Sequence, residues 1–420
     1  MLRLKLVGLG LVAVAGLSCS QAAPAQLAVK PWPVYRGDLA RDGRPAGAIL
    51  SVAEASRLAP LWRARLSGAV DGSAIVTGSD VYIGSQGGDL ADLAAPTGAV
   101  RWKRQGLGAI TGSPAVDSAV IYAATLTGHV RAVAISDGKS LWDWTAPGQQ
   151  PAIWSSPVLF AGTVLVGIGS QAGDTPLESG RIVALNGGHE VWELCAEAGC
   201  RPGGGIWSTP AIDKRGRAFV GVGNPDDGVL AFDATSGRRL WETSFYADAD
   251  RDLDVGATPV IVDFKGEEAI AIGSVGGVFK LLDAGSGREL WSSDLVQGSA
   301  VHGLIASAVS DATNLFVPSA SPPTGIFALK PADGSVQWSF GTSLPVYSSP
   351  AEGSHVLVFG EGNVFGDTGA GRITAVDATN RNVLWRYETH SAVRSGPVIA
   401  GNLVVVGDAA GDVLGFAPKS

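Results

Sequence analysis

Four aspartates alternate with other residues in one short stretch of the chain: Asp248, Asp250, Asp252 and Asp254. In an extended segment every second side chain points to the same side, so these carboxyl groups would share one face. Such crowding is costly unless the groups are solvated, paired with Arg251 or bound to a cation. The stretch is therefore a candidate cation or general-base site, with a solvated loop as the alternative.

Two other residues, which precede this stretch in the chain, have side chains suited to holding a ligand. Trp207 follows three consecutive glycines, and Asn224 precedes a proline. An indole face can stack on a flat ring, and an amide oxygen is a hard ligand of the kind calcium takes. The alternatives are a packed inner-strand aromatic and a plain turn. Trp154 stands at the matching place in its own repeat, which makes Trp207 less distinctive.

The N-terminus has the pattern of an export signal. Arg3 and Lys5 precede an apolar run over residues 6–17, and small residues follow. We expect a signal peptide over residues 1–22 with cleavage before Ala23. The alternative is a lipoprotein signal ending before Cys19, although the Leu usually found three residues before the cysteine is absent. Both predict a periplasmic or extracellular protein, and the second predicts a lipid anchor in the outer membrane.

Two cysteines remain in the body of the chain. Cys195 and Cys200 are separated by four residues, and no histidine or further cysteine stands beside them. In an exported protein this spacing predicts a disulfide closing a small loop, because a metal site would need more ligands.

Charge excludes some partners. The net charge is −8 and no basic block occurs, so nucleic acid and anionic membranes are poor partners. No later segment is uniformly apolar for the roughly 18 residues that a membrane-spanning helix needs.

A repeated sequence pattern predicts the strands that position these residues. Eight tryptophans recur at intervals of 40 to 50 residues, most of them closing a phrase such as the one from Gly228 to Trp241. A period of this length with several short strands predicts a β-propeller. The tryptophans are Trp62, Trp102, Trp142, Trp192, Trp241, Trp291, Trp338 and Trp385.

The number of blades follows from the strand starts. Each period opens with a small residue followed by proline, as in Ser113-Pro114, or a degenerate form of this step. There are eight starts; the last lacks a Trp-bearing strand, while Leu58 to Trp62 precedes the first start. We therefore predict an all-β, eight-bladed propeller of four-stranded antiparallel blades over residues 58–420, closed by the N-terminal strand, after an extension over residues 23–57. We expect a monomer.

The repeats resemble those of quinoprotein (pyrroloquinoline-quinone-type) propellers, most closely the polyvinyl-alcohol-dehydrogenase type. The resemblance includes the entry phrase over residues 32–38, the Gly-Gly-Gly-Ile-Trp phrase and Gly-Asn-Pro. It implies that Trp207 lies under a quinone ring, that Asn224 binds calcium, and that Asp252, with Asp254 second, is the general base. Asp174 or Glu178 would supply the remaining calcium ligand.

Three features depart from that family. Val275 stands where the family has a Lys or Arg that polarises a quinone carbonyl. Neither Asp174 nor Glu178 matches the family's calcium-binding Glu in register. The vicinal cysteine pair and the haem-attachment motif of some relatives are absent, so electrons would need an external acceptor.

The sequence thus supports two functions. One is an exported dehydrogenase that oxidises an alcohol with pyrroloquinoline quinone and Ca²⁺. The other is a non-catalytic propeller that binds an envelope protein, similar to the outer-membrane lipoprotein that assists β-barrel assembly.

Overall fold

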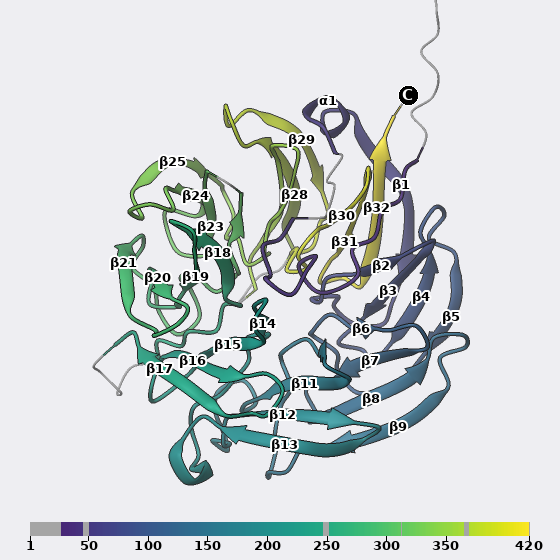
Figure 1. The fold of residues 1–420 in the computed structure, drawn as a ribbon. Coiled ribbons are helices and arrows are strands. Elements are labelled where there is room, and N and C mark those ends of the chain that lie inside the picture. The colour runs from purple at the N-terminus through teal and green to yellow at the C-terminus, as the bar shows by residue number, and fades with distance from the viewer. Residues whose placement is uncertain (1–26, 45–49, 247–251, 312, 365–368, 420) are drawn as a thin grey trace, which may run out of the picture.

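The structure is a computed structural model that describes residues 27–44, 50–246, 252–311, 313–364 and 369–419. Its strands form eight four-stranded antiparallel sheets around a central axis (Figure 1). The predicted eight-bladed propeller is confirmed. The expected signal peptide, Cys19, Asp248 and Asp250 lie outside the described residues.

The first four blades follow one another along the chain, each running from its innermost to its outermost strand. They are β2 (Ile75–Thr77), β3 (Asp80–Gly84), β4 (Leu90–Ala94) and β5 (Val100–Arg104); β6 (Ala115–Val116), β7 (Val120–Ala124), β8 (His129–Ala134) and β9 (Ser140–Thr145); β10 (Val158–Phe160), β11 (Thr163–Ile168), β12 (Arg181–Asn186) and β13 (His189–Cys195), followed by the 3₁₀ helix η1 (Ala198–Cys200); and β14 (Ala211–Ile212), β15 (Arg217–Val222), β16 (Gly228–Asp233) and β17 (Arg239–Ser244).

The last four blades continue the pattern until the ring closes. They are β18 (Val260–Phe264), β19 (Glu267–Gly273), β20 (Val278–Asp283) and β21 (Glu289–Asp294); β22 (Val309–Ser310), β23 (Leu315–Ser319), β24 (Gly325–Leu329) and β25 (Val336–Gly341); β26 (Ala351–Gly353), β27 (Val356–Gly362), β28 (Gly371–Asp377) and β29 (Val383–Glu388); and β30 (Val398–Ala400), β31 (Leu403–Gly407) and β32 (Asp412–Pro418) with β1 (Leu58–Arg65). Because β1 pairs with β32, the N-terminal strand completes blade 8, as predicted.

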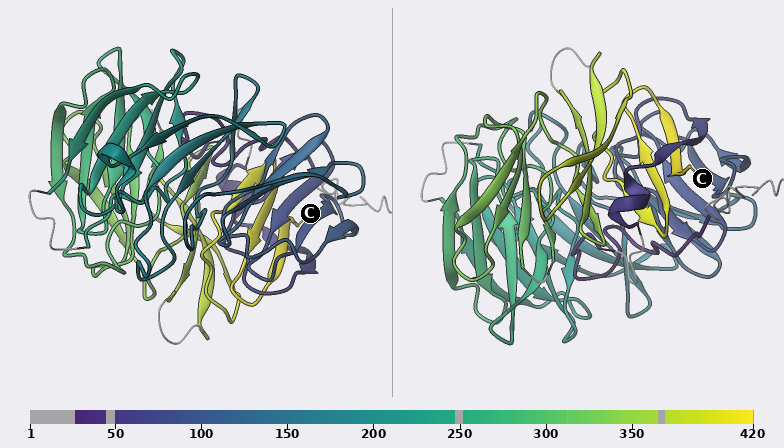
Figure 2. Two further views of the ribbon diagram at one scale, coloured as in Figure 1. Left: turned by 90° about the horizontal axis from the view of Figure 1, so that it is seen from below. Right: turned by 90° about the horizontal axis from the view of Figure 1, so that it is seen from above.

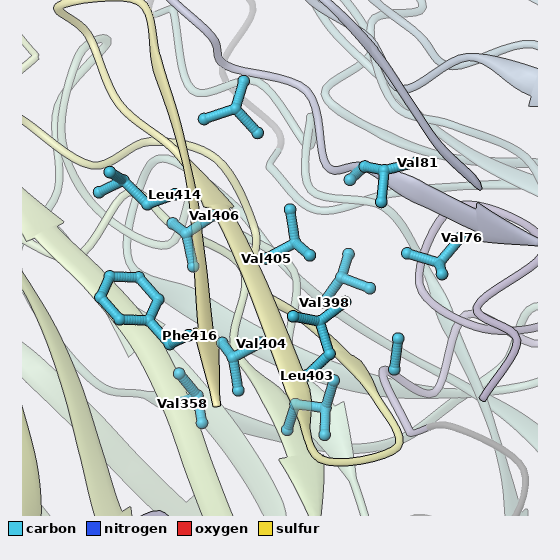
Figure 3. Close-up of a cluster of buried hydrophobic side chains, with 14 of the residues drawn as sticks. Val76, Val81, Val358, Val398, Leu403, Val404, Val405, Val406, Leu414 and Phe416 are labelled. Carbon is cyan, nitrogen blue, oxygen red and sulfur yellow. The ribbon is translucent and has the colours of Figure 1, made fainter. Parts of the chain in front are cut away.

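Apolar side chains fill the space between neighbouring blades. Around the closure point, residues of blades 7, 8 and 1 form one buried cluster (Figure 3). Val358 of blade 7, Phe416 of blade 8 and Val81 of blade 1 belong to it. The short helix α1 (Val52–Ala55) contacts β29 on the outer side of this junction (Figures 1 and 2). The closing strand is therefore anchored by burial as well as by main-chain hydrogen bonds.

The repeated tryptophans dock each blade onto the next. The indole N–H of Trp102 in blade 1 donates to the carbonyl oxygen of Ile135 in blade 2 at 2.9 Å. A Cβ on Gly138, whose φ is 68°, would lie 2.6 Å from the Trp102 ring. Only glycine suits this turn, because the backbone is left-handed and the ring lies against it. The spacing of Gly and Trp in the phrase is therefore the spacing of an inter-blade contact.

A ring of hydroxyl groups joins the starts of the inner strands. The backbone N–H of Ser113 donates to Ser156 Oγ, and that of Ser156 donates to Thr209 Oγ1, each at 2.9 Å. Thr209, Thr258, Ser307 and Ser349 continue the series through blade 7. In blades 3 to 7 the small residue at the start of the inner strand thus accepts a hydrogen bond from the preceding blade, a role that the sequence analysis did not anticipate.

Residues 27–44, here called the N-terminal segment, run across the ring at the ends of the inner strands. Main-chain bonds join Leu39 to Ile212 of blade 4 and Gly43 to Glu352 of blade 7. The buried Arg41 guanidinium donates to the carbonyl oxygens of Pro210 and Tyr35, at 3.0 and 2.7 Å. The segment, purple in Figure 1, therefore ties blades together that are distant in sequence.

Candidate functional site

The propeller axis contains a cavity of about 160 Å³ lined by the starts of the inner strands. Tyr35 of the N-terminal segment lines it, together with the serine and threonine hydroxyl ring. Trp154, Trp207 and Tyr347 supply aromatic side chains, and Asp71 and Arg394 supply charge. The cavity thus combines flat apolar faces with hydrogen-bonding groups, as small-molecule sites do.

Trp207 is held in this cavity by two contacts. A Cβ built on Gly256 would lie 1.6 Å from the Trp207 ring, so the indole rests directly against that glycine. The indole N–H donates to Asp254 Oδ2 at 2.8 Å. Trp154 lines the same cavity, and its N–H donates to the carbonyl oxygen of Ser170 at 2.9 Å. Both rings therefore have their polar edge satisfied.

Asp254 joins Trp207 to the loop that contains Asn224. Its Oδ1 accepts the backbone N–H of Asn224 at 3.0 Å, while Oδ2 accepts the indole. The Asp254 carbonyl also accepts the N–H of Val275 at 3.0 Å. Burial is the largest influence on the Asp254 carboxyl group and raises its pKa. Asp254 is thus committed to holding neighbouring groups in place.

The side-chain oxygen of Asn224 has no hydrogen-bond partner in the described part of the chain, although it is buried. The Asn224 side chain also hydrogen-bonds Asp252, and since a carboxylate only accepts, the Asn224 amide nitrogen is the donor. A buried carbonyl-type oxygen without a donor costs free energy unless a cation or water binds it. Asn224 therefore offers the kind of oxygen that a calcium site requires.

Asp227 interacts with Asp252 and Asp254, and we call these three acids and Asn224 the Asn224 cluster; the sequence analysis missed Asp227. Its residue exposure is 1%, and neither carboxylate oxygen has a hydrogen bond of full geometry among the described residues, although the backbone N–H of Leu253 lies near enough to lower its pKa. Burial, together with the charges of Asp254 and Asp252, raises its pKa to about 7. Because two carboxylates cannot donate to each other when both are ionised, a proton or a cation must separate Asp227 from Asp254. Its only sequence signal was an acid in the turn that begins at Asn224.

Asp252 is the most exposed acid of the cluster. Burial of its carboxyl group and the charges of Asp254 and Asp174 raise its pKa to about 6, and the Asn224 hydrogen bond opposes them. A carboxylate with a pKa near 6 is ionised at neutral pH and can accept a proton. Unlike Asp254, it is not engaged with the Trp207 indole.

The two alternative calcium ligands occupy different positions. Asp174 is exposed, but its charge acts on both Asp252 and Asp254. Glu178 is buried, and its Oε1 accepts the backbone N–H groups of Gln149 and Gln150 at 2.8 and 2.6 Å. The structure therefore brings Asp174 toward the Asn224 cluster and directs Glu178 to another loop. Val275, which stands where the quinoprotein resemblance would place a Lys or Arg side chain, is buried.

The predicted disulfide between Cys195 and Cys200 is present. It closes the short loop that contains η1 at the end of blade 3. The carbonyl oxygen of Cys200 accepts the hydroxyl of Ser179 at 2.7 Å. The loop is thus fixed against the segment that leads into β12.

Fold and cavity together define a propeller of the pyrroloquinoline-quinone type. The family described as Outer membrane protein assembly factor BamB matches residues 47–272 and 274–420, and the chain belongs to this family. No curated protein sequence matches the chain. No described helix has the length and apolar character needed to cross a membrane.

Solved structures of two functional kinds share the fold. Quinohemoprotein alcohol dehydrogenase from Comamonas testosteroni is 15% identical, with a TM-score of 0.80 over 92% of this chain and 80% of its own. A europium-containing methanol dehydrogenase is 15% identical, with a TM-score of 0.78 over 92% of this chain and 98% of its own. BamB from Moraxella catarrhalis is 17% identical, with a TM-score of 0.66 over 86% of this chain and 99% of its own. At these identities the likeness establishes the fold alone.

Proposed function

We propose that the protein is an exported quinoprotein-type dehydrogenase that oxidises an alcohol with pyrroloquinoline quinone and Ca²⁺. The single observation that carries this proposal is the buried Asn224 side-chain oxygen, which has no hydrogen-bond partner among the described residues and belongs to the same turn as the buried Asp227 carboxylate. A set of hard oxygens without donors is what a calcium ion would satisfy. The europium enzyme among the similar structures is a metal-containing dehydrogenase of the same fold.

In this proposal Asn224 and Asp227 hold the cation, with Asp174 within electrostatic reach of the same cluster. The quinone, when bound, supplies the hydride acceptor. Trp207 offers its indole face from the cavity wall, and Gly256 leaves room for the ring by having no side chain. The hydroxyl ring and Arg394 supply donors to carboxylate groups on a ligand. These residues fit a flat, anionic cofactor.

Asp252 is the general base of the proposal, because it alone combines exposure with a pKa near the operating range. It takes the hydroxyl proton of the alcohol, and the Asn224 amide orients its carboxylate. Asp254 is a positioning residue, since both of its oxygens hold neighbouring donors.

A non-catalytic envelope scaffold is the second candidate function. Two observations favour it: the family match to an outer membrane protein assembly factor, and the buried Val275 where the quinoprotein resemblance would place a Lys or Arg. In this case the protein would use its loop faces to bind an envelope protein.

Calorimetric titration of pyrroloquinoline quinone into the purified chain with Ca²⁺ present tests the first candidate. One-to-one binding, weakened by Asn224→Ala and Asp252→Ala, is the expected result. Asn186→Ala and Asp263→Ala are matched controls on exposed parts of blades 3 and 5 and should bind as the wild type does. Absence of binding at tens of micromolar cofactor would exclude the dehydrogenase and leave the scaffold.

A further inference from the structure

The outer strand of blade 6 differs from the other outer strands because it carries no charge. Each of the other seven has at least one charged side chain, whereas β25 reads Val-Gln-Trp-Ser-Phe-Gly. Among the described residues β25 pairs with β24 alone, so its other edge lies free at the rim of the ring (Figure 1). Charged side chains on an edge strand oppose pairing with a further strand. β25 lacks this protection, and its Val336 is 49% exposed.

The contact between glycine and tryptophan is missing beside this strand. In blades 1 to 6 a glycine four residues before the blade's own tryptophan lies against the tryptophan of the preceding blade. A Cβ on Gly334, for example, would lie 2.5 Å from the Trp291 ring. Blade 7 has Arg381 at this position, with a φ of 67°. Because arginine has a Cβ, Trp338 of blade 6 cannot lie against this turn in the same way.

A cleft of about 690 Å³ lies at this junction of blades 6 and 7. Gln337 and Trp338 of β25 line it, together with Lys330 of blade 6 and with Ala378 and Thr379 of blade 7. At four other junctions the indole N–H donates to the carbonyl oxygen three residues before the glycine, which corresponds to Ala378 here. The Trp338 N–H has no acceptor in the described part of the chain, so it is available to a ligand.

The charge in the cleft favours an acidic ligand. Lys330 lines the cleft and forms no ion pair with any residue that the structure describes. Asp311 also lines it, but its Oδ1 accepts the backbone N–H groups of Thr313 and Asn314, each at 2.6 Å. The aspartate is thus engaged within its own turn, and the unpaired charge is positive. An exposed pair with Lys330 would contribute little affinity, but it would select one sign of charge.

We propose that β25 and this cleft bind an extended acidic segment of a partner protein. The segment adds a strand to the free edge of β25, where main-chain hydrogen bonds supply affinity, and one of its apolar side chains enters the cleft beside Trp338. An acidic side chain pairs with Lys330. A second copy of this chain would bring no acid on its own β25, so a different protein fits better. The axial cavity is not involved, and the inference is independent of the proposed dehydrogenase activity.

Fluorescence anisotropy of a labelled peptide tests the edge. A peptide of about eight residues in which valine and glutamate alternate should bind the full chain with a Kd of about 10–100 µM. The same peptide with lysine in place of glutamate should bind at least about tenfold more weakly. Val336→Glu, which adds a charge to β25, should weaken binding of the glutamate peptide by about as much. Val100→Glu is the matched control, since Val100 is exposed at the same position of β5, and should bind as the wild type does.

Arg381→Gly tests the cleft without disrupting the fold. Glycine suits the left-handed backbone and lets Trp338 lie against the turn, so the variant should be at least as stable as the wild type and bind the glutamate peptide at least about tenfold more weakly. Arg381→Ala keeps the Cβ but removes the charge, and it should bind as the wild type does.

Three results would overturn the proposal. One is no change in anisotropy at about 1 mM chain, and another is equal affinity for the two peptides. The third is a concentration-dependent dimer, measured by analytical ultracentrifugation, that Val336→Glu abolishes, because the occupant of the β25 edge would then be a second copy of this chain.

Discussion

The indole N–H of Trp207 donates to Asp254 Oδ2 at 2.8 Å, although the two residues belong to segments 47 positions apart. The same carboxylate accepts the backbone N–H of Asn224 through its other oxygen. One aspartate thus holds both the aromatic wall of the cavity and the start of the turn that contains Asp227. Changes around this contact should affect the cavity and the acidic cluster together.

Gly256→Ala should displace the Trp207 indole, because the added methyl group would lie 1.6 Å from its ring. Overpacking of this kind costs about 1–3 kcal/mol of unfolding free energy, measurable by urea denaturation. Gly205→Ala is the matched control, since its nearest contact is at 3.7 Å and its φ is not positive. Equal stability losses in both variants would show that Trp207 does not occupy the position described.

Asp227→Asn should weaken calcium binding about 10- to 100-fold if the Asn224 cluster binds the ion, as changes at metal sites commonly do. In EDTA the same variant should be more stable than the wild type, because an amide replaces a buried carboxylate that faces Asp254. Calorimetry with Ca²⁺ and thermal unfolding in EDTA measure the two effects. Glu190→Gln, an exposed acid on β13, should change neither.

Most of the fold was predictable because its determinants repeat. Most blades have their own copy of the Gly and Trp contact, so the period revealed the number of blades and the closing strand. The N-terminal segment was recognised as an entry phrase, but its path was not predictable. Its bonds, such as Arg41 to Pro210, join residues 169 positions apart and leave no periodic pattern.

The candidate site was predictable only in part. Trp207, Asn224 and Asp254 were each candidates in the sequence, and Asp254 hydrogen-bonds both of the others in the structure. Asp227 was missed because an acid in a turn is common, and its interaction with Asp254 of the next blade leaves no pattern in the sequence. Glu178 was a candidate calcium ligand, yet the backbone amides of Gln149 and Gln150 hold its carboxylate elsewhere. Side-chain direction within long loops is set by such neighbours rather than by sequence spacing.

Asp92→Asn should stabilise the protein at alkaline pH and have little effect near pH 4. Burial and the charge of Asp80 raise the pKa of Asp92 to about 7, and its Oδ1 has no donor among the residues described. A raised folded-state pKa means that protonation favours the folded chain, so wild-type stability falls as pH rises from the unfolded value of 3.8 toward 7. The variant lacks this loss, so above pH 7 its unfolding free energy should exceed that of the wild type by about 1–3 kcal/mol. Urea unfolding at pH 4 and pH 8 measures the difference, and a gain of equal size at both would contradict it.

Arg41→Lys should destabilise the propeller by about 2–4 kcal/mol, because a lysine cannot replace the several bonds of the buried guanidinium. Arg41 donates to the carbonyl oxygens of Pro210, Tyr35 and Asp38, and burial lowers its pKa to about 10. Arg57→Lys is the control, since Arg57 also donates to main-chain oxygens but is exposed. Its unfolding free energy should change by less than about 0.5 kcal/mol. Comparable losses in both variants would mean that the N-terminal segment does not depend on Arg41.

Trp102→Phe should cost more stability than Trp192→Phe, although both residues dock one blade onto the next. The Trp102 N–H donates to Ile135, so phenylalanine leaves a carbonyl oxygen without its partner. The Trp192 N–H is buried and has no acceptor in the part of the chain described, so phenylalanine there removes an unsatisfied donor. Both changes lose a similar apolar area, and the difference should therefore be about 1–2 kcal/mol in urea unfolding. A larger loss in Trp192→Phe would show that indole volume, rather than the hydrogen bond, dominates the docking of the blades.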